Sequence, residues 1–340
     1  MKSIKIFYFS GTGNAKQISL WFSELAVGKN IDCQLFDIAK TDVKTIDYVN
    51  SDDFLIIIAP IHGFNYSKLV LDFICRFPKG TNRIALMCTA GGIKTGRIIT
   101  PGLAGAAFMF SSAILRGKGY QITGQIIFDM PTNFISLHPA MSEKSAQFVF
   151  EKNYALVKKH FENLYAGKND FAARKRIIAD IIVGLPSFMY LYWGRFFMSK
   201  TLYASHKCNH CNLCVKECPV KAIKIVNQRP FWTVKCESCL KCMNICPVRA
   251  IEAAHGLVIL VFYLWITGSA ILMGLLPSFF HHWFVAFLTF DVFLFFGLFF
   301  LLYRFQHLLL TNRIIAKMIS FTSLTKYKFW GRYICKYVKM

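Results

Sequence analysis

The sequence predicts an α/β chain: a doubly wound parallel sheet, followed by a small α+β domain and a two-helix transmembrane hairpin. Three observations support this prediction. Apolar, strand-like runs alternate with helical patterns over residues 1–170. Eight of the 12 cysteines form two copies of one spacing between residues 208 and 246. Two long apolar segments with a single charged residue follow at 257–303. A chain of 340 residues is long enough for several such domains.

The first domain, residues 1–170, is expected to contain five strands in β-α alternation, which implies a parallel sheet with helices on both faces. Continuous β-branched and aromatic runs such as FLIIIA are typical of strands covered on both sides. We expect strands at 3–10, 32–38, 54–60, 83–90 and 120–130, and helices at 14–27, 67–77, 100–116 and 143–165.

A glycine-rich loop joins the first expected strand to the first helix. It consists of Ser10, Gly11, Thr12, Gly13, Asn14 and Ala15. Such a loop offers backbone N–H groups, hydroxyls and a helix N-terminus to a phosphate. A dinucleotide fingerprint is not expected, because Lys16 follows where its third glycine should be.

This loop resembles the FMN-phosphate loop of flavodoxins, and two loops at later strand ends are similar to the same family. They are Pro60, Ile61, His62, Gly63 and Phe64, and Thr89, Ala90, Gly91 and Gly92. The resemblance implies a flavodoxin-like domain in which residues 10–15 hold the FMN phosphate and the other two loops flank the isoalloxazine. Ligands bind at such strand ends in open α/β sheets. Two positions depart from the family pattern: Ala15 replaces a hydroxyl residue and His62 replaces an aromatic one.

The cysteines follow the pattern C-x2-C-x2-C-x3-C-P twice, 28 residues apart. The first run is Cys208, Cys211, Cys214 and Cys218, and the second is Cys236, Cys239, Cys242 and Cys246. Bacterial ferredoxins bind [4Fe–4S] clusters with this spacing, and the fourth cysteine of each run ligates the other cluster. We therefore expect two [4Fe–4S] clusters, one bound by Cys208, Cys211, Cys214 and Cys246, the other by Cys236, Cys239, Cys242 and Cys218.

Zinc and disulfides explain this pattern less well. Structural zinc usually takes two C-x2-C pairs, which two runs of four with a terminal proline do not resemble. Disulfides would require an oxidising compartment. Lys2 and Lys5 precede only a short apolar run, interrupted from Ser10 onward, so a secretory signal is not expected. The ferredoxin-like domain is placed at 201–256, and the order of the two domains resembles flavodoxin–ferredoxin fusion proteins of anaerobic bacteria.

The apolar segment at 257–276 has no charged residue, and its length of about 30 Å as a helix matches a hydrocarbon core. A second span, 283–303, contains Asp291. Burying this carboxylate costs roughly 3 kcal/mol, which 15 Leu, Val and Phe residues offset. Asp291 either serves a quinone or proton path or hydrogen-bonds Thr267 or Ser269 on the other helix.

Basic residues flank the hairpin on both sides, and the turn between the spans has none, so both termini are expected in the cytoplasm. Residues 171–200 predict a basic, interfacial linker helix, in which Asp180 and Pro186 argue against a third span. Residues 304–340, with eight cations and no acid, predict a basic amphipathic tail. The net charge of +22 therefore favours an anionic membrane surface over nucleic acid as the partner.

The leading functional prediction is a membrane-anchored electron-transfer iron–sulfur flavoprotein, which exchanges electrons with a ferredoxin-like partner protein or a quinone. An alternative is a flavin-dependent reductase fed by the clusters, with His62 and Asn133 as donors beside the flavin. A third is a redox sensor or assembly factor that signals through the hairpin.

Overall fold

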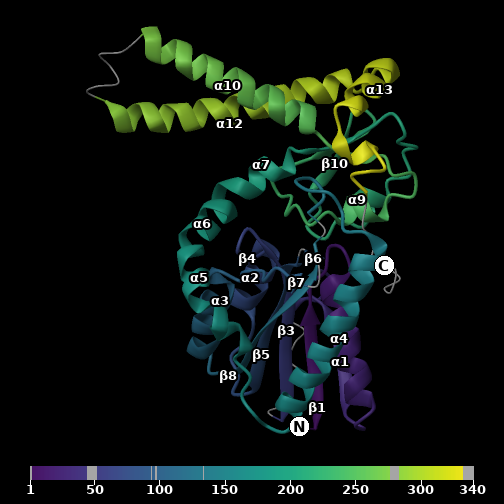
Figure 1. Cartoon of the computed structure of the whole chain (residues 1–340), viewed down its shortest axis with the longest axis vertical. Helices are drawn as coiled ribbons and strands as arrows, with labels where there is room; N and C mark the ends of the chain where they lie inside the picture. Colours follow the sequence, from purple (N-terminus) through teal and green to yellow (C-terminus); the bar gives the residue numbers. More distant parts are fainter. Residues whose placement is uncertain are drawn as a thin grey trace.

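The first domain is built on a parallel sheet in the order β2-β1-β3-β5-β8 (Figure 1). The computed structural model describes residues 2–43, 52–92, 94, 95, 98–132, 134–275 and 283–331. The strands are β1 Ser3–Tyr8, β2 Asp32–Asp37, β3 Asp53–His62, β5 Arg83–Gly92 and β8 Gln121–Pro131, all parallel in their pairing. This order is that of flavodoxin-like sheets. The predicted doubly wound α/β fold is confirmed.

Two helical layers cover this sheet because successive side chains of each strand point to opposite faces. One core contains Phe7, Leu55 and Leu86 and is covered by α2 Lys68–Arg76 and α3 Ala106–Gly117. The other contains Ile6, Ile56 and Met87 and is covered by α1 Asn14–Val27 and α4 Glu143–Tyr165. Both faces are therefore buried, as the continuous apolar strands predict.

Helix α3 begins later than the expected residue 100. The preceding segment ends at Gly105, whose φ of 55° lies in the left-handed region, and the carboxylate of Asp180 accepts hydrogen bonds from Ala104 N and Gly105 N, both at 2.8 Å. This tertiary contact holds residues 100–105 as a loop at the strand ends. A short antiparallel strand, β4 Asn65–Tyr66, pairs with the end of β3.

The second domain repeats one backbone design. It contains β9 Leu202–Ala204, α8 Leu213–Lys216, β10 Ile223–Val226, β11 Arg229–Trp232, α9 Lys241–Ile245 and β12 Ile251–Ala253. Strands β9 and β12 pair antiparallel, as do β10 and β11. Left-handed residues recur 28 positions apart, at His210 and Ser238, Asn212 and Leu240, and Lys221 and Arg249. The sequence duplication is thus also a structural one.

The linker between the domains is a chain of short helices instead of one straight helix. It consists of η2 Ala172–Arg176, α5 Ile177–Ile182, α6 Gly184–Met189, η3 Tyr190–Gly194 and α7 Arg195–Ser199. A 77° bend separates 172–182 from 184–199. The segment 172–182 is the lower arm of the linker. The guanidinium of Arg176 in this arm forms a bidentate ion pair with Asp129 of β8, at 2.6 and 2.9 Å, and so joins the arm to the sheet. The linker runs along one side of the molecule up to the hairpin (Figure 1).

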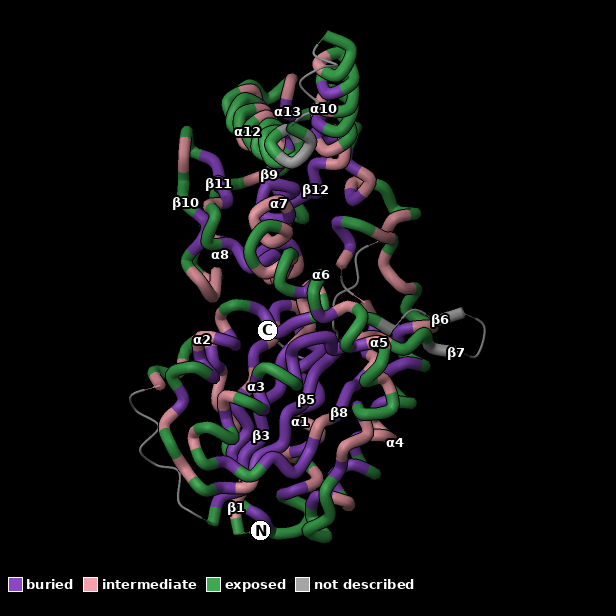
Figure 2. The backbone as a smooth tube through the Cα atoms, turned by 90° about the vertical axis from the view of Figure 1, so that its left-hand side faces the viewer, coloured by how far each residue is buried: buried purple, intermediate pink, exposed green. Residues whose placement is uncertain are grey.

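Two apolar helices extend from the second domain, α10 His255–Leu275 and α12 Phe284–Leu309. Among the described residues, two helices are long and apolar enough to cross a membrane, with mean hydropathies of 2.2 and 1.8. Most of their surface is exposed (Figure 2). The expected turn at 277–282 lies outside the described residues.

The second apolar helix continues to Leu309, past the expected end at 303, because its last turns pack on the second domain. The His307 ring hydrogen-bonds the Val226 carbonyl at 3.0 Å. Helix α13, Arg313–Phe321, follows. Trp330 then binds the loop after β8 by hydrogen bonds from its Nε1 to Ile135 O and from Ala140 N to its own carbonyl. Of the predicted tail, residues 332–340 lie outside the described part of the chain.

Candidate functional site

The loop after β1 forms the start of α1, with Gly13 as the N-cap residue. Gly13 has a φ of 100°, a conformation that strongly favours glycine. The Ser10 hydroxyl accepts a hydrogen bond from Gly13 N at 3.1 Å, which closes the loop. Asn14 is buried, and its side-chain amide donates to the Pro131 carbonyl at 2.8 Å. Gly13 offers the helix no side-chain cap, and an anion at this N-terminus would be stabilised by the helix dipole.

The three predicted flavin loops surround one cavity of about 720 Å³. Thirteen of the fifteen predicted residues line it: Ser10, Gly11, Thr12, Asn14, Ala15, Pro60, Ile61, His62, Gly63, Phe64, Thr89, Ala90 and Gly91. Gly13 belongs to the same loop as the residues before it, and Gly92 ends the strand that carries the third loop. This volume is within the range of cofactor sites. The arrangement fits FMN, because a helix N-terminus and two loop walls meet at the edge of one sheet.

The sequence did not predict the rest of the cavity wall. It comes from the segment before α3, from the chain after β8, from the linker and from the second cysteine run. These residues are Pro101, Gly102, Leu103, Pro131, Thr132, Phe134, Leu137, His138, Tyr190, Gly194, Phe197, Met198, Ser238, Cys239 and Leu240. Asn133, an expected donor, lies outside the described residues. No local pattern predicts that these positions meet at the cavity, because they come together only through the packing of distant segments.

His62 lies in the cavity wall as a neutral side chain. Burial lowers its pKa to about 4, although a hydrogen bond to the backbone of Glu237 opposes this effect. Its Nδ1 is buried and has no hydrogen-bond partner. This nitrogen could therefore form a hydrogen bond with a ligand bound in the cavity. Elsewhere in the cavity wall, His138 Nε2 and the Thr132 hydroxyl are hydrogen-bonded at 2.9 Å.

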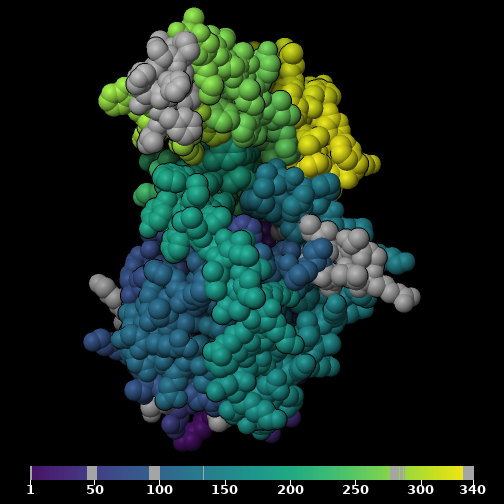
Figure 3. Space-filling view, turned by 60° about the vertical axis from the view of Figure 1, so that its left-hand side comes forward, coloured from purple at the N-terminus to yellow at the C-terminus, as the bar shows by residue number. Residues whose placement is uncertain are grey.

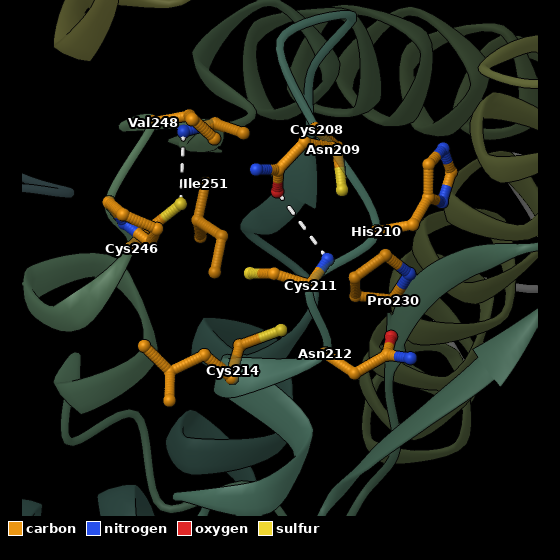
Figure 4. Close-up of a pocket in the computed structure, with 13 residues that line it drawn as sticks. Cys208, Asn209, His210, Cys211, Asn212, Cys214, Pro230, Cys246, Val248 and Ile251 are labelled. Carbon is orange, nitrogen blue, oxygen red and sulfur yellow. Dashed lines mark hydrogen bonds between the residues drawn. The ribbon is translucent and has the colours of Figure 1, made fainter.

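The first cysteine run and the last cysteine of the second line a common space. Cys208, Cys211, Cys214 and Cys246 surround it, and their sulfur atoms point toward one another (Figure 4). This is the set that the crossed assignment predicts. The surrounding loop is shaped by left-handed residues His210 and Asn212. Burial and the neighbouring thiols Cys208 and Cys246 raise the pKa of Cys214 to about 11.

The other four cysteines form the second set. Burial raises the pKa of Cys236 to about 12 and that of Cys239 to about 11, and Cys218 contributes to both shifts through its proximity. Backbone N–H groups point at sulfur in equivalent places of the two halves, from Ala222 to Cys218 and from Ala250 to Cys246, both at 3.2 Å. Such N–H···S bonds tune iron–sulfur centres.

The grouping of four thiols around one space fits a polynuclear cluster. Within the part of the chain that the structure describes, no three His, Cys, Asp or Glu side chains converge closely enough to bind a single metal ion. A zinc ion would need four sulfurs at about 2.3 Å from one point. A cubane instead binds one thiolate at each iron. Its iron would also keep these thiols deprotonated despite their raised pKa values.

The second cysteine loop lies directly on the flavin loops. An ideal Cβ at Gly11 would lie 2.2 Å from the Cys239 carbonyl oxygen, so only a glycine allows this approach. Glu237 reinforces the junction. One carboxylate oxygen accepts from Lys68 N at the start of α2, and the other pairs with Arg195 of the linker, both at 2.9 Å. One buried carboxylate thus joins both domains and the linker.

Comparisons with known proteins agree with parts of this description. The model of the 4Fe-4S binding domain family matches residues 205–224. No curated protein matches the chain. Flavodoxin 1 from Bacillus cereus is 13% identical, with 47% of this chain and 97% of that one covered and a TM-score of 0.31.

Rubredoxin:oxygen oxidoreductase from Desulfovibrio gigas is also 13% identical, with 49% of this chain but only 37% of that one covered and a TM-score of 0.33. A flavodoxin from an archaeon is 14% identical over 46% of this chain and 97% of its own, with a TM-score of 0.29. The fold assignment therefore rests on the strand order. The chain joins a flavodoxin-like domain to a 4Fe–4S binding domain and to two helices that could span a membrane.

Proposed function

We propose that the chain is a membrane-anchored electron-transfer iron–sulfur flavoprotein that holds one FMN and two [4Fe–4S] clusters. One observation carries the proposal: the cavity that fits FMN is lined jointly by the flavin loops and by Cys239 of the second cysteine run. When bound, FMN can exchange one or two electrons and each cubane one.

The chain's own residues would hold these groups in a row. Gly11 brings the phosphate loop against the backbone of Cys239, and Glu237 fixes that loop to α2 and the linker. Cys214 and Cys242 lie in one cluster of buried side chains, and Cys214 helps to raise the pKa of Cys242, so the two cysteine sets are neighbours. The proposed order is flavin cavity, second set, then first set.

The first cysteine set, at the end of this row away from the flavin cavity, suits an acidic redox partner such as a ferredoxin-like protein. Cys211 of the first set is exposed. Five residues earlier in the chain, burial and then four positive charges lower the pKa of His206. These charges are Lys207, Lys326, Lys317 and Arg313. A cationic surface beside an exposed ligand favours encounter with an anionic protein.

The hairpin would anchor this assembly in the cytoplasmic membrane with both termini in the cytoplasm. Its length and hydropathy support the anchoring, and the basic flanks support the orientation. A quinone is a second candidate partner, because it would be available at the same membrane.

The proposal is tested by cofactor analysis of the purified full-length protein. We expect about eight irons and one FMN per chain, since each run would bind one cubane. About four irons per chain, or FAD in place of FMN, would overturn it.

A flavin-dependent reductase is the second candidate. It is favoured by the size of the cavity and by the His138 and Thr132 pair on its wall, which could orient a substrate. Steady-state turnover with a reduced ferredoxin and small-molecule acceptors separates the two functions. Saturable turnover of a soluble acceptor, lost in His138→Ala, would support the reductase.

A further inference from the structure

The linker presents apolar side chains to the outside and buries polar ones. The exposed surface, called the linker ridge, consists of Ile177, Ile178, Ile181, Ile182, Leu185, Phe188, Met189, Tyr192 and Trp193. Ile178, Leu185 and Ile182 are 75%, 74% and 71% exposed. In contrast, Asp180 on the same helix is buried against the loop before α3. The usual arrangement, with apolar residues inside and polar residues outside, is thus reversed in the linker. Because a contiguous exposed apolar patch usually marks an interaction surface, the ridge is a candidate for one.

The ridge lies on the side of the molecule from which the hairpin extends. Figure 1 shows α5, α6 and α7 along the same edge toward which α10 and α12 project. Seen from that side in Figure 2, the apolar helices point at the viewer and the linker descends below them, largely exposed. Figure 3 shows the teal linker as a continuous band between the hairpin and the first domain.

The linker is also joined to the hairpin by packing. The ring of Phe197 stacks on Phe299 of α12 with centroids 4.5 Å apart and on Phe295 at 5.7 Å. Below this joint, Arg176 and Asp180 hold the lower arm to the first domain. The linker is therefore held to the hairpin at its upper end and to the first domain at its lower end.

We propose that the linker ridge docks on the surface of the lipid bilayer that the hairpin spans, as a second membrane contact. This inference rests on the proposed membrane anchoring. Helices α10 and α12 project past the linker on this side of the molecule (Figure 1), and a membrane interface suits the aromatic rings of Tyr192 and Trp193. The exposed cations Arg174 and Lys175 at the start of the linker suit anionic headgroups.

Docking would place the flavin cavity at the membrane surface. Tyr190 and Gly194 line the cavity from the same helical turn that presents Tyr192 and Trp193 outward. In Figure 3 the purple N-terminal segment is visible in a hollow beside the linker. A lipid-soluble acceptor could thus reach the cavity without crossing bulk water, which gives the ridge a role beyond attachment.

The experiment uses the full-length protein in nanodiscs of phosphatidylethanolamine and phosphatidylglycerol, with the photocrosslinker benzoylphenylalanine at single positions. Position 182 tests the ridge. Position 27 at the end of α1 is the matched control, because Val27 is similarly exposed, at 64%, but lies far from the hairpin. Position 293, an exposed residue of α12, reports membrane insertion itself.

We expect lipid adducts by mass spectrometry at 182 and 293 and none above background at 27. Adducts at 293 without any at 182 would overturn the ridge proposal and leave the anchor intact. No adducts at either position would overturn both. Crosslinks from 182 to a second copy of the chain, or equal lipid adducts at 182 and 27, would also contradict the proposal. Position 178 repeats the ridge test should the protein with the crosslinker at 182 fail to fold.

Discussion

Gly11 and Cys239 are in backbone contact, although 228 residues separate them in the sequence: a Cβ on Gly11 would lie 2.2 Å from the Cys239 carbonyl oxygen. The contact joins the loop that fits a flavin phosphate to the loop of the second cysteine run. No flexible side chain intervenes, so the two loops cannot adapt independently. The proposed electron transfer depends on this junction.

Gly11→Ala is expected to disturb the junction, because the new methyl group must displace backbone atoms. Overpacking of this kind costs about 1–3 kcal/mol. We expect a lower thermal midpoint and weaker FMN retention. The matched control is Gly117→Ala at the end of α3, where a Cβ meets nothing within 4 Å. Such a change is expected to be neutral or to stabilise by about 0.4–1 kcal/mol. Equal behaviour of the two variants would contradict the assigned contact.

His62 predicts a pH dependence of stability. Burial lowers its pKa to about 4, whereas the pKa of an unfolded histidine is about 6.5. Between these values the unfolded chain takes up a proton and the folded chain does not. Stability should therefore fall by about 1–3 kcal/mol as the pH decreases from about 6.5 toward 4. Thermal midpoints of the wild type and His62→Gln, measured across this window, should converge as the pH falls. Parallel curves would show that the fold does not hold His62 as a neutral group.

Asp291 has a partner within the hairpin. The Ser269 hydroxyl donates to its Oδ1 at 2.5 Å, and both residues are buried between α10 and α12. This was one of the two roles expected for the carboxylate. Ser269→Ala should destabilise the hairpin by about 0.6–2 kcal/mol, in the range of interhelical hydrogen bonds in membranes. Thr267→Ala on the exposed side of the same helix should have no such effect.

Unfolding of these variants in mixed detergent micelles measures the difference. Asp291→Asn preserves an acceptor for Ser269, so it should retain stability, cofactor content and quinone reduction. A large loss of quinone reduction with normal cofactors in Asp291→Asn would instead give the carboxylate a functional role.

Cys246→Ser should remove the cluster of the first run, because the four sulfurs of Cys208, Cys211, Cys214 and Cys246 face one space. Iron content should fall from about eight to about four per chain. Adding Cys211→Ser should then remove no further iron, whereas adding Cys239→Ser should remove nearly all of it. The reverse pattern would show that each run binds its own cluster. Cys33→Ser, outside both runs, is the control.

The sequence predicted those features that depend on local pattern. Helices α1 and α4 begin and end where expected, since Gly13 and Ser142 precede clear amphipathic runs. The cysteine motif, with the ligation pattern of bacterial ferredoxins, predicted two crossed sets, and Cys208, Cys211, Cys214 and Cys246 line one space. The linker was predicted as one interfacial helix, and its bend and the way it closes the cavity were missed. Those features depend on tertiary contacts such as Glu237 with Lys68, 169 residues apart, for which no local pattern exists.

The most direct test of the central claim is flash reduction of the flavin in the anaerobic full-length protein, followed by absorbance at the flavin and cluster bands. If the cavity and the second cysteine set are coupled through Gly11 and Cys239, electrons should leave the flavin at a rate independent of protein concentration. This phase should persist in Cys211→Ser, which lacks the outer cluster, and disappear in Cys239→Ser. A rate proportional to protein concentration, or an unchanged phase in Cys239→Ser, would contradict the account.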